Sequence, residues 1–336
     1  MMRDFSSSSD RIVTVFGGSG FIGRHLVRAL AREGWRVRVA TRRPELAYHL
    51  QPLGKVGQIH AVQANIRFPE SLAAALSGAE AAVNLVGILA ETGKQSFDRV
   101  QAQGAAAVAD AVKNAGIGKF VHMSAIGADA NSASAYARSK ALGEAAVLSA
   151  TPHANILRPS VVFGPEDQFF NRFASMARLM PALPLIGGGT TRLQPVYVGD
   201  VAATASRLLA GEGRPGAVYE LGGPAIRTMR ELMAFVLAVT KRPRVLAPIS
   251  FGLASTIGGI TELANKALLG LLPAEFVFTR DQVELLKHDN VVSAEAEAEG
   301  RTLKGLGITP ESMEAIVPAY LHRYRKGGQF ADERLA

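Results

Sequence analysis

Cysteine is absent from the 336-residue sequence, which excludes disulfides, thiolate catalysis and cysteine-ligated metal sites. Aromatic residues are scarce at 7%, and no zinc or recognition-helix pattern accompanies the net charge of +8. We therefore expect no bound metal and no nucleic-acid partner. The basic balance suits an anionic cofactor or an anionic membrane surface instead.

Long apolar runs are missing as well. No stretch reaches the roughly 18 to 20 apolar residues that a membrane-spanning helix needs. Residues 1–10, MMRDFSSSSD, lack the apolar core of a signal peptide, so we expect a disordered leader on a chain that is not secreted. These absences predict a cytoplasmic protein.

The most informative feature present is a glycine-rich stretch near the start of the chain. A short run of β-branched and aromatic residues, Ile12–Phe16, predicts a buried strand, and the pattern from Ile22 predicts a helix to about Arg32. Three glycines at three-residue spacing join them, which allows a sharp turn, close approach of a pyrophosphate and tight helix packing. The alternative is a purely structural turn. The residues expected to bind the dinucleotide here are Gly17, Ser19, Gly20, Phe21, Ile22 and Gly23.

The end of the second predicted strand indicates which dinucleotide is bound. An NAD-binding site usually carries an acid there, to hold the adenosine ribose. This chain has Thr41, followed by Arg42 and Arg43. A hydroxyl and guanidinium groups pair with a 2′-phosphate, which an acid would repel. The prediction is therefore NADP(H), with NAD(H) possible; the alternative is that both arginines are solvated loop charges.

The next elements alternate between strand and helix. This order predicts an α/β fold of the Rossmann type, a doubly wound and mostly parallel sheet covered by helices on both faces. At the strand ends, Asn65 and Ile66 are expected at the adenine, and Val86 and Gly87 beneath the nicotinamide ribose. The predicted segments are a strand 59–66, a helix 69–76, a strand 81–88, a helix 97–115 and a strand 119–127.

A predicted helix at 134–150 carries the candidate chemistry. Tyr136 and Lys140 are four residues apart and so share one helix face. A neighbouring ammonium and a positive nicotinamide favour the phenolate, which would make Tyr136 an acid/base, while Ser124 would hold a substrate oxygen. The alternative is a packed tyrosine beside a lysine that extends to solvent.

Four motifs resemble the extended short-chain dehydrogenase/reductase family, which includes sugar-nucleotide epimerases and dehydratases. They are GGSGFIG, the set Ser124/Tyr136/Lys140, ILRPSVVFGP (156–165) and QPVYVGDVA (194–202). The resemblance covers roughly residues 11–237. It implies that RPSVVFG passes the nicotinamide, which adds Pro159 and Val162 to the cofactor site. The chain departs from the family pattern with Asn65 in place of Asp and Gln101 in place of Asn.

Three features resemble one atypical branch of that family: NLVGI, the Thr41-Arg42 pair and FTRDQVELLKHDNVV (278–292). The branch is typified by the NADPH-binding accessory subunit nine of the alpha subcomplex of respiratory complex I and its bacterial relatives. The resemblance implies a tightly held NADPH that serves structure rather than turnover, near the quinone and membrane end of the complex.

The second half is expected to form a smaller C-terminal α/β lobe. The predicted division is a nucleotide-binding core at 11–165 and a lobe at 166–336, with part of 190–237 returning to the sheet. Residues 246–272 are apolar, and predict either a helix packed on the core or a surface that contacts a membrane or partner. A final amphipathic helix is predicted at 309–324, with Pro310 in its first turn. Its basic end, HRYRK, is either solvated or in contact with acidic lipid or protein.

Two functions follow. The first is an accessory, assembly or structural subunit of a complex I-like or quinone-related system, peripheral on the cytoplasmic face of the inner membrane and holding NADPH. The second is an active NADP-dependent oxidoreductase, epimerase or dehydratase that acts on a carbonyl or sugar-nucleotide substrate with Tyr136, Lys140 and Ser124. The complete set of three leaves the second open.

Overall fold

The computed structural model describes residues 11–93, 95–268 and 278–328. A seven-stranded sheet forms its centre, in the order β11-β6-β5-β4-β1-β2-β3. Every pairing in it is parallel. This confirms the predicted doubly wound α/β fold. The strands are β1 (Ile12–Phe16), β2 (Arg36–Thr41), β3 (Ile59–Gln63), β4 (Ala81–Asn84), β5 (Lys119–Met123), β6 (Asn155–Pro159) and β11 (Val218–Leu221).

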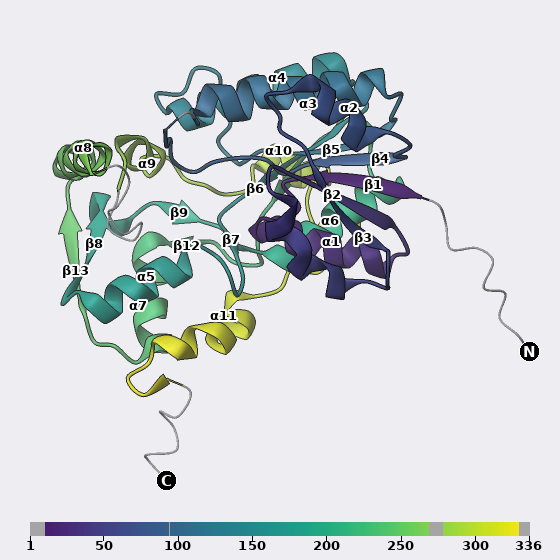
Figure 1. Ribbon diagram of the computed structural model, residues 1–336. Helices are drawn as coiled ribbons and strands as arrows, with labels where there is room; N and C mark the ends of the chain where they lie inside the picture. The colour runs from purple at the N-terminus through teal and green to yellow at the C-terminus, as the bar shows by residue number, and fades with distance from the viewer. Residues whose placement is uncertain (1–10, 94, 269–277, 329–336) are drawn as a thin grey trace, which may run out of the picture.

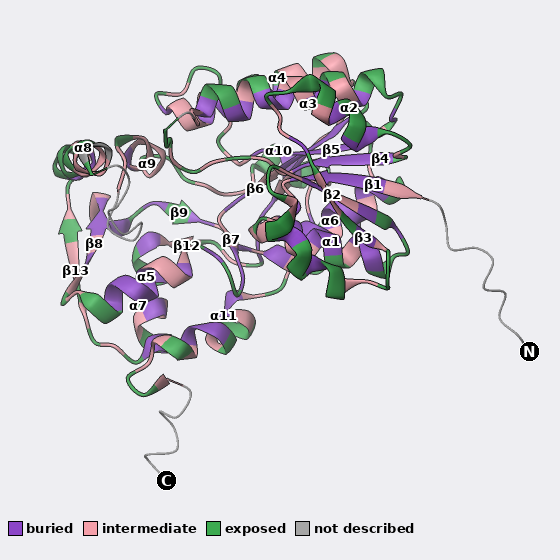
Figure 2. Cartoon of the chain, in the orientation of Figure 1, coloured by how far each residue is buried: buried purple, intermediate pink, exposed green. Residues whose placement is uncertain are grey.

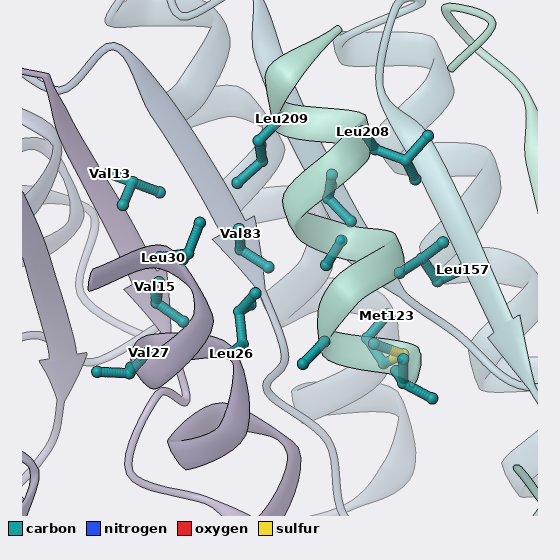
Figure 3. Packing of buried hydrophobic residues seen from close by; sticks show 14 of the residues in the cluster. Val13, Val15, Leu26, Val27, Leu30, Val83, Met123, Leu157, Leu208 and Leu209 are labelled. Atoms are coloured by element: carbon teal, nitrogen blue, oxygen red, sulfur yellow. The ribbon is translucent and has the colours of Figure 1, made fainter. Parts of the chain in front are cut away.

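Helices cover both faces of the sheet (Figure 1). On one face the apolar sides of α1 and α6 pack against the strands, as the cluster around Val15, Leu26 and Leu209 shows (Figure 3). On the other face α2, α3 and α4 pack around Phe16, Val108 and other fully buried residues. Burial of the central strands β1 and β4 on both faces explains why their sequences are almost entirely apolar. The helices are α1 (Phe21–Arg32), α2 (Pro69–Leu76), α3 (Gln103–Asn114), α4 (Ala135–Ala150) and α6 (Val198–Ala210).

The strand order reverses between β1 and β4. Successive strands run outward from β1 through β2 and β3, and in the other direction from β4 through β5 and β6. In open α/β sheets the crevice at the carboxyl ends of such a pair is where ligands bind. The glycine turn after β1 lies at this point.

The second half forms a lobe with its own core, built around Phe170, Leu232 and Val317. One segment of it returns to the core, because β11 pairs with β6 at the edge of the main sheet. The lobe elements are β7 (Val162–Phe163), α5 (Phe170–Leu179), β8 (Ala182–Ile186), β9 (Arg192–Leu193), β10 (Val196–Tyr197), β12 (Arg227–Thr228), α7 (Met229–Thr240), β13 (Val245–Ile249), α8 (Phe251–Ala267), α9 (Arg280–Leu285) and α11 (Met313–Leu321). Helix α10 (Ala294–Ala298) lies on the core instead, where the Ser293 amide donates to Glu220 of β11 (2.7 Å).

The sequence patterns misplace two parts of this lobe. The apolar segment that begins at Leu246 opens with a strand, β13, which pairs with β8, and only then becomes helix α8. Pro248 explains the difference, since proline is poorly tolerated inside a helix. The final helix begins at Met313 rather than near Thr309, because the Glu311 amide donates to Asp200 Oδ2 (2.9 Å) and Ser312 caps the helix. Residues 1–10 and 269–277 lie outside the described residues.

The basic segment 322–326 makes more hydrogen bonds to the lobe than its sequence pattern indicates. Arg323 donates to Asn171 Oδ1 (2.6 Å) and Arg325 donates to the Val239 carbonyl (2.9 Å). Two of its three strong cations therefore hold the end of the chain onto the lobe. None of the described helices is both long and apolar enough to cross a bilayer.

Candidate functional site

The glycine turn has the backbone geometry that its spacing predicts. Gly17 adopts a left-handed φ of +78°, and its amide donates to the Ala40 carbonyl at 3.2 Å. A Cβ on Gly23 would lie 2.5 Å from the carbonyl oxygens of Gly17 and Gly18. Only glycine permits this approach of helix α1 to the turn.

The start of helix α1 is prepared for an anion. Its N-cap is Gly20, which supplies no capping side chain, and its first turn contains no acid. The first amides of the helix are therefore available to a pyrophosphate, and the helix dipole favours negative charge there. Ser19, Phe21 and Ile22 are all half-buried around this turn.

Charged and polar groups of the predicted adenosine end lie beyond β2 and β3. Thr41 is half-buried, whereas Arg42 and Arg43 are exposed. Arg42 makes one long hydrogen bond, from Nη1 to Gln95 Oε1 at 3.3 Å. Its guanidinium is thus displaced easily toward a ligand.

The segment after β3 forms part of the wall of a pocket. Asn65 Oδ1 accepts from the Arg67 amide (3.2 Å), so this side chain holds the loop in shape. Ile66 forms part of the wall of a pocket of about 390 Å³. The residues that line the pocket are Ile66, Arg67, Pro69, Arg99, Gln103, Gly104 and Ala107.

The predicted nicotinamide end brings together residues from three elements. Lys140 is buried on α4, and its Nζ donates to the Met123 carbonyl at 3.1 Å. That Nζ lies 5.8 Å from the centre of the Tyr136 ring. Gly87 follows β4, and a Cβ added to it would be 3.4 Å from the same Nζ. The structure therefore places Gly87, Tyr136 and Lys140 in one small region, while Val86 is half-buried just before it.

Two polar atoms near this region have no hydrogen-bond partner in the described part of the chain. They are Ser124 Oγ, just past β5, and Gln101 Oε1. Their residues are 3% and 2% exposed. An unpaired buried acceptor costs about 1 to 3 kcal/mol, so such atoms indicate an absent polar ligand. A dinucleotide with a polar substrate fits this arrangement.

Burial sets the protonation of the site. Desolvation raises the pKa of Tyr136 to about 12, and the negative charge of Asp281 adds to this effect. Desolvation also lowers the pKa of Lys140 to about 8, against the opposing influence of Glu144. These shifts describe the nucleotide-free protein, which lacks the positive nicotinamide that the predicted phenolate also requires. Tyr136 is a neutral phenol at neutral pH, which is a proton donor.

The segment that includes Pro159 and Val162 is fixed across the carboxyl edge of the sheet. Pro159 is buried at the end of β6, and its carbonyl accepts from the Ile126 amide at 3.1 Å. Val162 is half-buried in β7. Close by, a Cβ on Gly164 would be 3.3 Å from the Phe21 ring, so this segment packs against the start of helix α1.

The sequence patterns do not predict three residues of the site. Gln101 lies in a π-helical turn, Asp98–Ala102, before α3, and its Nε2 donates to Ser139 Oγ (3.2 Å). Phe97 packs edge-on against Tyr136 with ring centres 5.6 Å apart. Asp281 comes from the lobe. The one sequence signal for Gln101 is that it stands where the family usually has Asn. No local sequence pattern indicates Asp281. No group of three His, Asp or Glu residues suited to a metal occurs within the described ranges.

The site combines three features: a parallel sheet whose strand order reverses at β1 and β4, a glycine turn at a helix N-terminus, and the Ser124, Tyr136 and Lys140 set. Together they define a dinucleotide-binding protein of the short-chain dehydrogenase type. Comparison with known proteins agrees: the pattern of the NAD dependent epimerase/dehydratase family matches residues 13–222. The chain belongs to that family.

Similar proteins extend the match beyond the family pattern. The chain is 35% identical to the NADH dehydrogenase [ubiquinone] 1 alpha subcomplex subunit 9, mitochondrial, of Arabidopsis thaliana over 326 residues, which are 96% of this chain and 80% of the relative. It is 36% identical to the ceramide reductase of Caulobacter vibrioides over 192 residues, 57% of this chain and 59% of the relative.

Among solved structures, an NADPH-dependent quinone oxidoreductase from Escherichia coli, complexed with NADPH, superposes with a TM-score of 0.69. It is 19% identical and covers 92% of this chain and 99% of its own. The dTDP-glucose 4,6-dehydratase from Streptomyces venezuelae, with NAD, has a TM-score of 0.67 and 21% identity, and covers 96% and 98%. These likenesses support the fold.

Proposed function

We propose that this protein holds NADP(H) as a structural cofactor and is an accessory or assembly subunit of a complex I-like NADH:quinone oxidoreductase. The observation that carries the proposal is the extent of the similarity to the complex I subunit. It runs over 96% of the chain, whereas the family pattern ends at residue 222. The C-terminal lobe, where a family member acquires its particular role, is thus shared with that subunit.

The lobe presents a surface suited to docking. Helix α8 exposes Leu253, Ile257, Ile260 and Leu263, with exposed fractions between 38% and 70%. Their spacing of three and four residues places them on one side of the helix, which lies at the edge of the lobe (Figures 1 and 2). An apolar stripe on an outer helix is typical of a protein or membrane contact. This surface would hold the protein peripherally on the cytoplasmic face of the inner membrane.

The preference for NADP(H) over NAD(H) rests on the exposed pair after β2. Arg42 and Arg43 are exposed beside Thr41, and the helix N-terminus nearby receives the pyrophosphate. Guanidinium groups bind a phosphate through charge-assisted hydrogen bonds. A tightly held NADPH would also occupy the crevice around Ser124 and Gln101.

Purification from native membranes tests the proposal. The tagged protein should carry NADPH through gel filtration and should copurify with respiratory-chain subunits. The nucleotide is identified by enzymatic cycling and the partners by mass spectrometry. Purification without nucleotide and without a membrane partner, combined with turnover of a soluble substrate, would refute it.

The paired variant Ile260→Glu with Leu263→Glu sharpens this test. Both side chains are exposed by more than 60%, so the free energy of unfolding should change by no more than about 0.5 kcal/mol. Copurification of the membrane partner should nevertheless be lost. The matched control is Leu142→Glu, an exposed leucine on helix α4 of the core. Retention of the partner by the paired variant would exclude α8 as the docking surface.

A second candidate function is supported by the unpaired Ser124 Oγ, which follows Met123, the residue whose carbonyl accepts from Lys140. In this candidate the protein is an NADP-dependent reductase, epimerase or dehydratase, with Ser124 holding a carbonyl or sugar-nucleotide oxygen. Tyr136→Phe should then reduce the rate by at least about 10²-fold, the usual contribution of a positioned acid/base, with nucleotide binding unchanged. An unchanged cellular phenotype in this variant favours the structural role.

A further inference from the structure

A carboxylate from the C-terminal lobe lies directly on helix α4, which carries Tyr136 and Lys140. Asp281, in α9, accepts hydrogen bonds from the Ala135 amide (2.6 Å), the Ser134 hydroxyl (2.8 Å) and the Tyr136 amide (3.2 Å). These groups form the first turn of α4, at its N-cap and first two positions. Asp281 thus occupies a position that favours negative charge, and it is 145 residues from Tyr136 in the sequence.

The segment that carries Asp281 is attached to the site at several further points. We call residues 278–292 the strap. Thr191 donates to the Leu286 carbonyl, and Asp289 pairs with Arg192 at 2.7 Å. Asn290 accepts from Ser160 Oγ (2.6 Å) and donates to the Ile126 carbonyl (3.2 Å). The strap therefore joins the lobe to α4, to the loop after β5 and to the segment after β6.

Among the described residues, Asp281 is the anion in contact with the backbone of Tyr136. On helix α4, Lys140 Nζ lies 5.8 Å from the centre of the Tyr136 ring, and Arg138 is engaged with the carbonyls of Ser132 and Ala133. The buried Glu144 on the same helix pairs with Arg158 (2.6 Å). Behind Lys140 on β5, burial keeps the pKa of His122 at about 3, so that imidazole is neutral. The π-helical turn beside α4 brings Asp98 and Arg99, both exposed. On the strap, Arg280 is exposed and Glu284 pairs with Lys287 (2.5 Å).

We propose that Asp281 is a positioning residue through which the C-terminal lobe holds the N-terminus of α4 and keeps Tyr136 as a protonated phenol. A phenolate attracts the positive nicotinamide of NADP⁺, whereas a neutral phenol does not. Asp281 therefore biases the site toward the uncharged nicotinamide of NADPH. This inference deepens the proposed function and rests on it for the identity of the nucleotide. The effect on the phenol itself is independent of any bound nucleotide.

The decisive measurement is a titration of Tyr136 by NMR between pH 8 and 13, in nucleotide-free protein labelled with [ζ-¹³C]tyrosine. Tyr136→Phe assigns the resonance. The wild-type signal should remain that of the phenol up to a pH well above 10, the ordinary tyrosine pKa. Asp281→Asn removes the charge and keeps one acceptor oxygen in place of the two that receive the Ala135 and Tyr136 amides. Its midpoint should fall by about one unit, a tenfold rise in the phenolate-to-phenol ratio at a given pH.

Asp289→Asn is the matched control. It removes a carboxylate from the same strap, but its partner is Arg192 rather than α4, so the Tyr136 midpoint should not move. A second measurement is the affinity for NADP⁺ as a function of pH. Affinity should rise as the phenolate forms, and the rise should begin about one pH unit lower in Asp281→Asn than in the wild type.

Equal midpoints in the wild type and Asp281→Asn would overturn the proposal, as would an equal shift in Asp289→Asn. A wild-type midpoint at or below the ordinary value of about 10 would overturn it with no variant at all, which covers the case of a poorly folding Asp281→Asn. Failure of the purified protein to retain NADPH would count against the structural-cofactor role alone. The titration of the nucleotide-free protein would still decide the role of Asp281.

Discussion

The ionisable groups at the two ends of the proposed nucleotide site lie in opposite environments, exposed at the adenosine end and buried at the nicotinamide end. At the adenosine end, Arg42 and Arg43 are exposed and Arg42 makes one long hydrogen bond. At the nicotinamide end, Lys140 is 6% exposed and His122 is 2% exposed, and both have pKa values shifted by burial. Exposed cations are screened by water and adapt to a ligand, whereas buried groups respond strongly to each neighbouring charge.

This contrast separates recognition from chemistry. In the proposed function the adenosine end selects the nucleotide with exposed groups, which cost little free energy to keep in solvent. The nicotinamide end determines protonation, and there a single carboxylate from the lobe affects the phenol. A protein that only stores NADPH needs the first end intact. A protein that turns it over needs both.

The glycine turn is common to both ends, so changing it should have the largest effect. In Gly23→Ala the new Cβ would lie 2.5 Å from two carbonyl oxygens, which forces helix α1 away from the turn. We expect a loss of about 3 kcal/mol, or at least 10²-fold in affinity for NADPH and NADH alike. Isothermal titration checks this. Gly118→Ala is the control, since its Cβ would meet no atom within 4 Å. Normal binding by Gly23→Ala would show that the turn is not the pyrophosphate site.

His122 tests the buried end alone. Desolvation and Lys140 lower its folded pKa to about 3, below the ordinary value of 6.5. Between these two pH values only the unfolded state binds the proton, so the free energy of unfolding increases with pH. The stability that the neutral imidazole contributes is lost progressively as the pH falls below 6.5. The slope is about 1.4 kcal/mol per pH unit.

His122→Gln keeps a partner for Asn84 Nδ2, which lies 3.2 Å from His122 Nδ1, and removes the titration. Between pH 6.5 and 5 the wild type should therefore lose about 2 kcal/mol more than the variant. Urea denaturation at both pH values measures the difference. Parallel pH profiles would mean that His122 is protonated in the folded protein.

Local patterns in the sequence were sufficient for the fold of the nucleotide-binding core. The strand before Gly17 and the helix after it lie where the apolar periodicity predicts them. The third, fourth and fifth strands are shorter than predicted, since apolar residues continue past the point at which the neighbouring strand stops pairing. Residues 81–88, for example, pair only as far as Asn84.

The protonation of the nicotinamide end was beyond such patterns. The spacing of Tyr136 and Lys140 brings their side chains together, but it does not report the burial that raises one pKa and lowers the other. Asp281 is 145 residues from Tyr136 in the sequence and reaches it only through folding of the lobe. No periodicity connects the two positions.

Arg42→Ala probes the exposed end and should have the smallest effect. The guanidinium is solvated before binding, so the 2′-phosphate contact contributes about 1 kcal/mol, or 5- to 10-fold in the Kd for NADPH. NADH lacks that phosphate, and its Kd should change less than twofold. Arg32→Ala, an exposed cation at the far end of α1, controls for net charge. The difference between the nucleotides should shrink at high salt, because exposed charges are screened. Equal weakening for both nucleotides would mean that Arg42 supports the loop rather than the phosphate, and the preference for NADP(H) would then rest on Thr41 and Arg43.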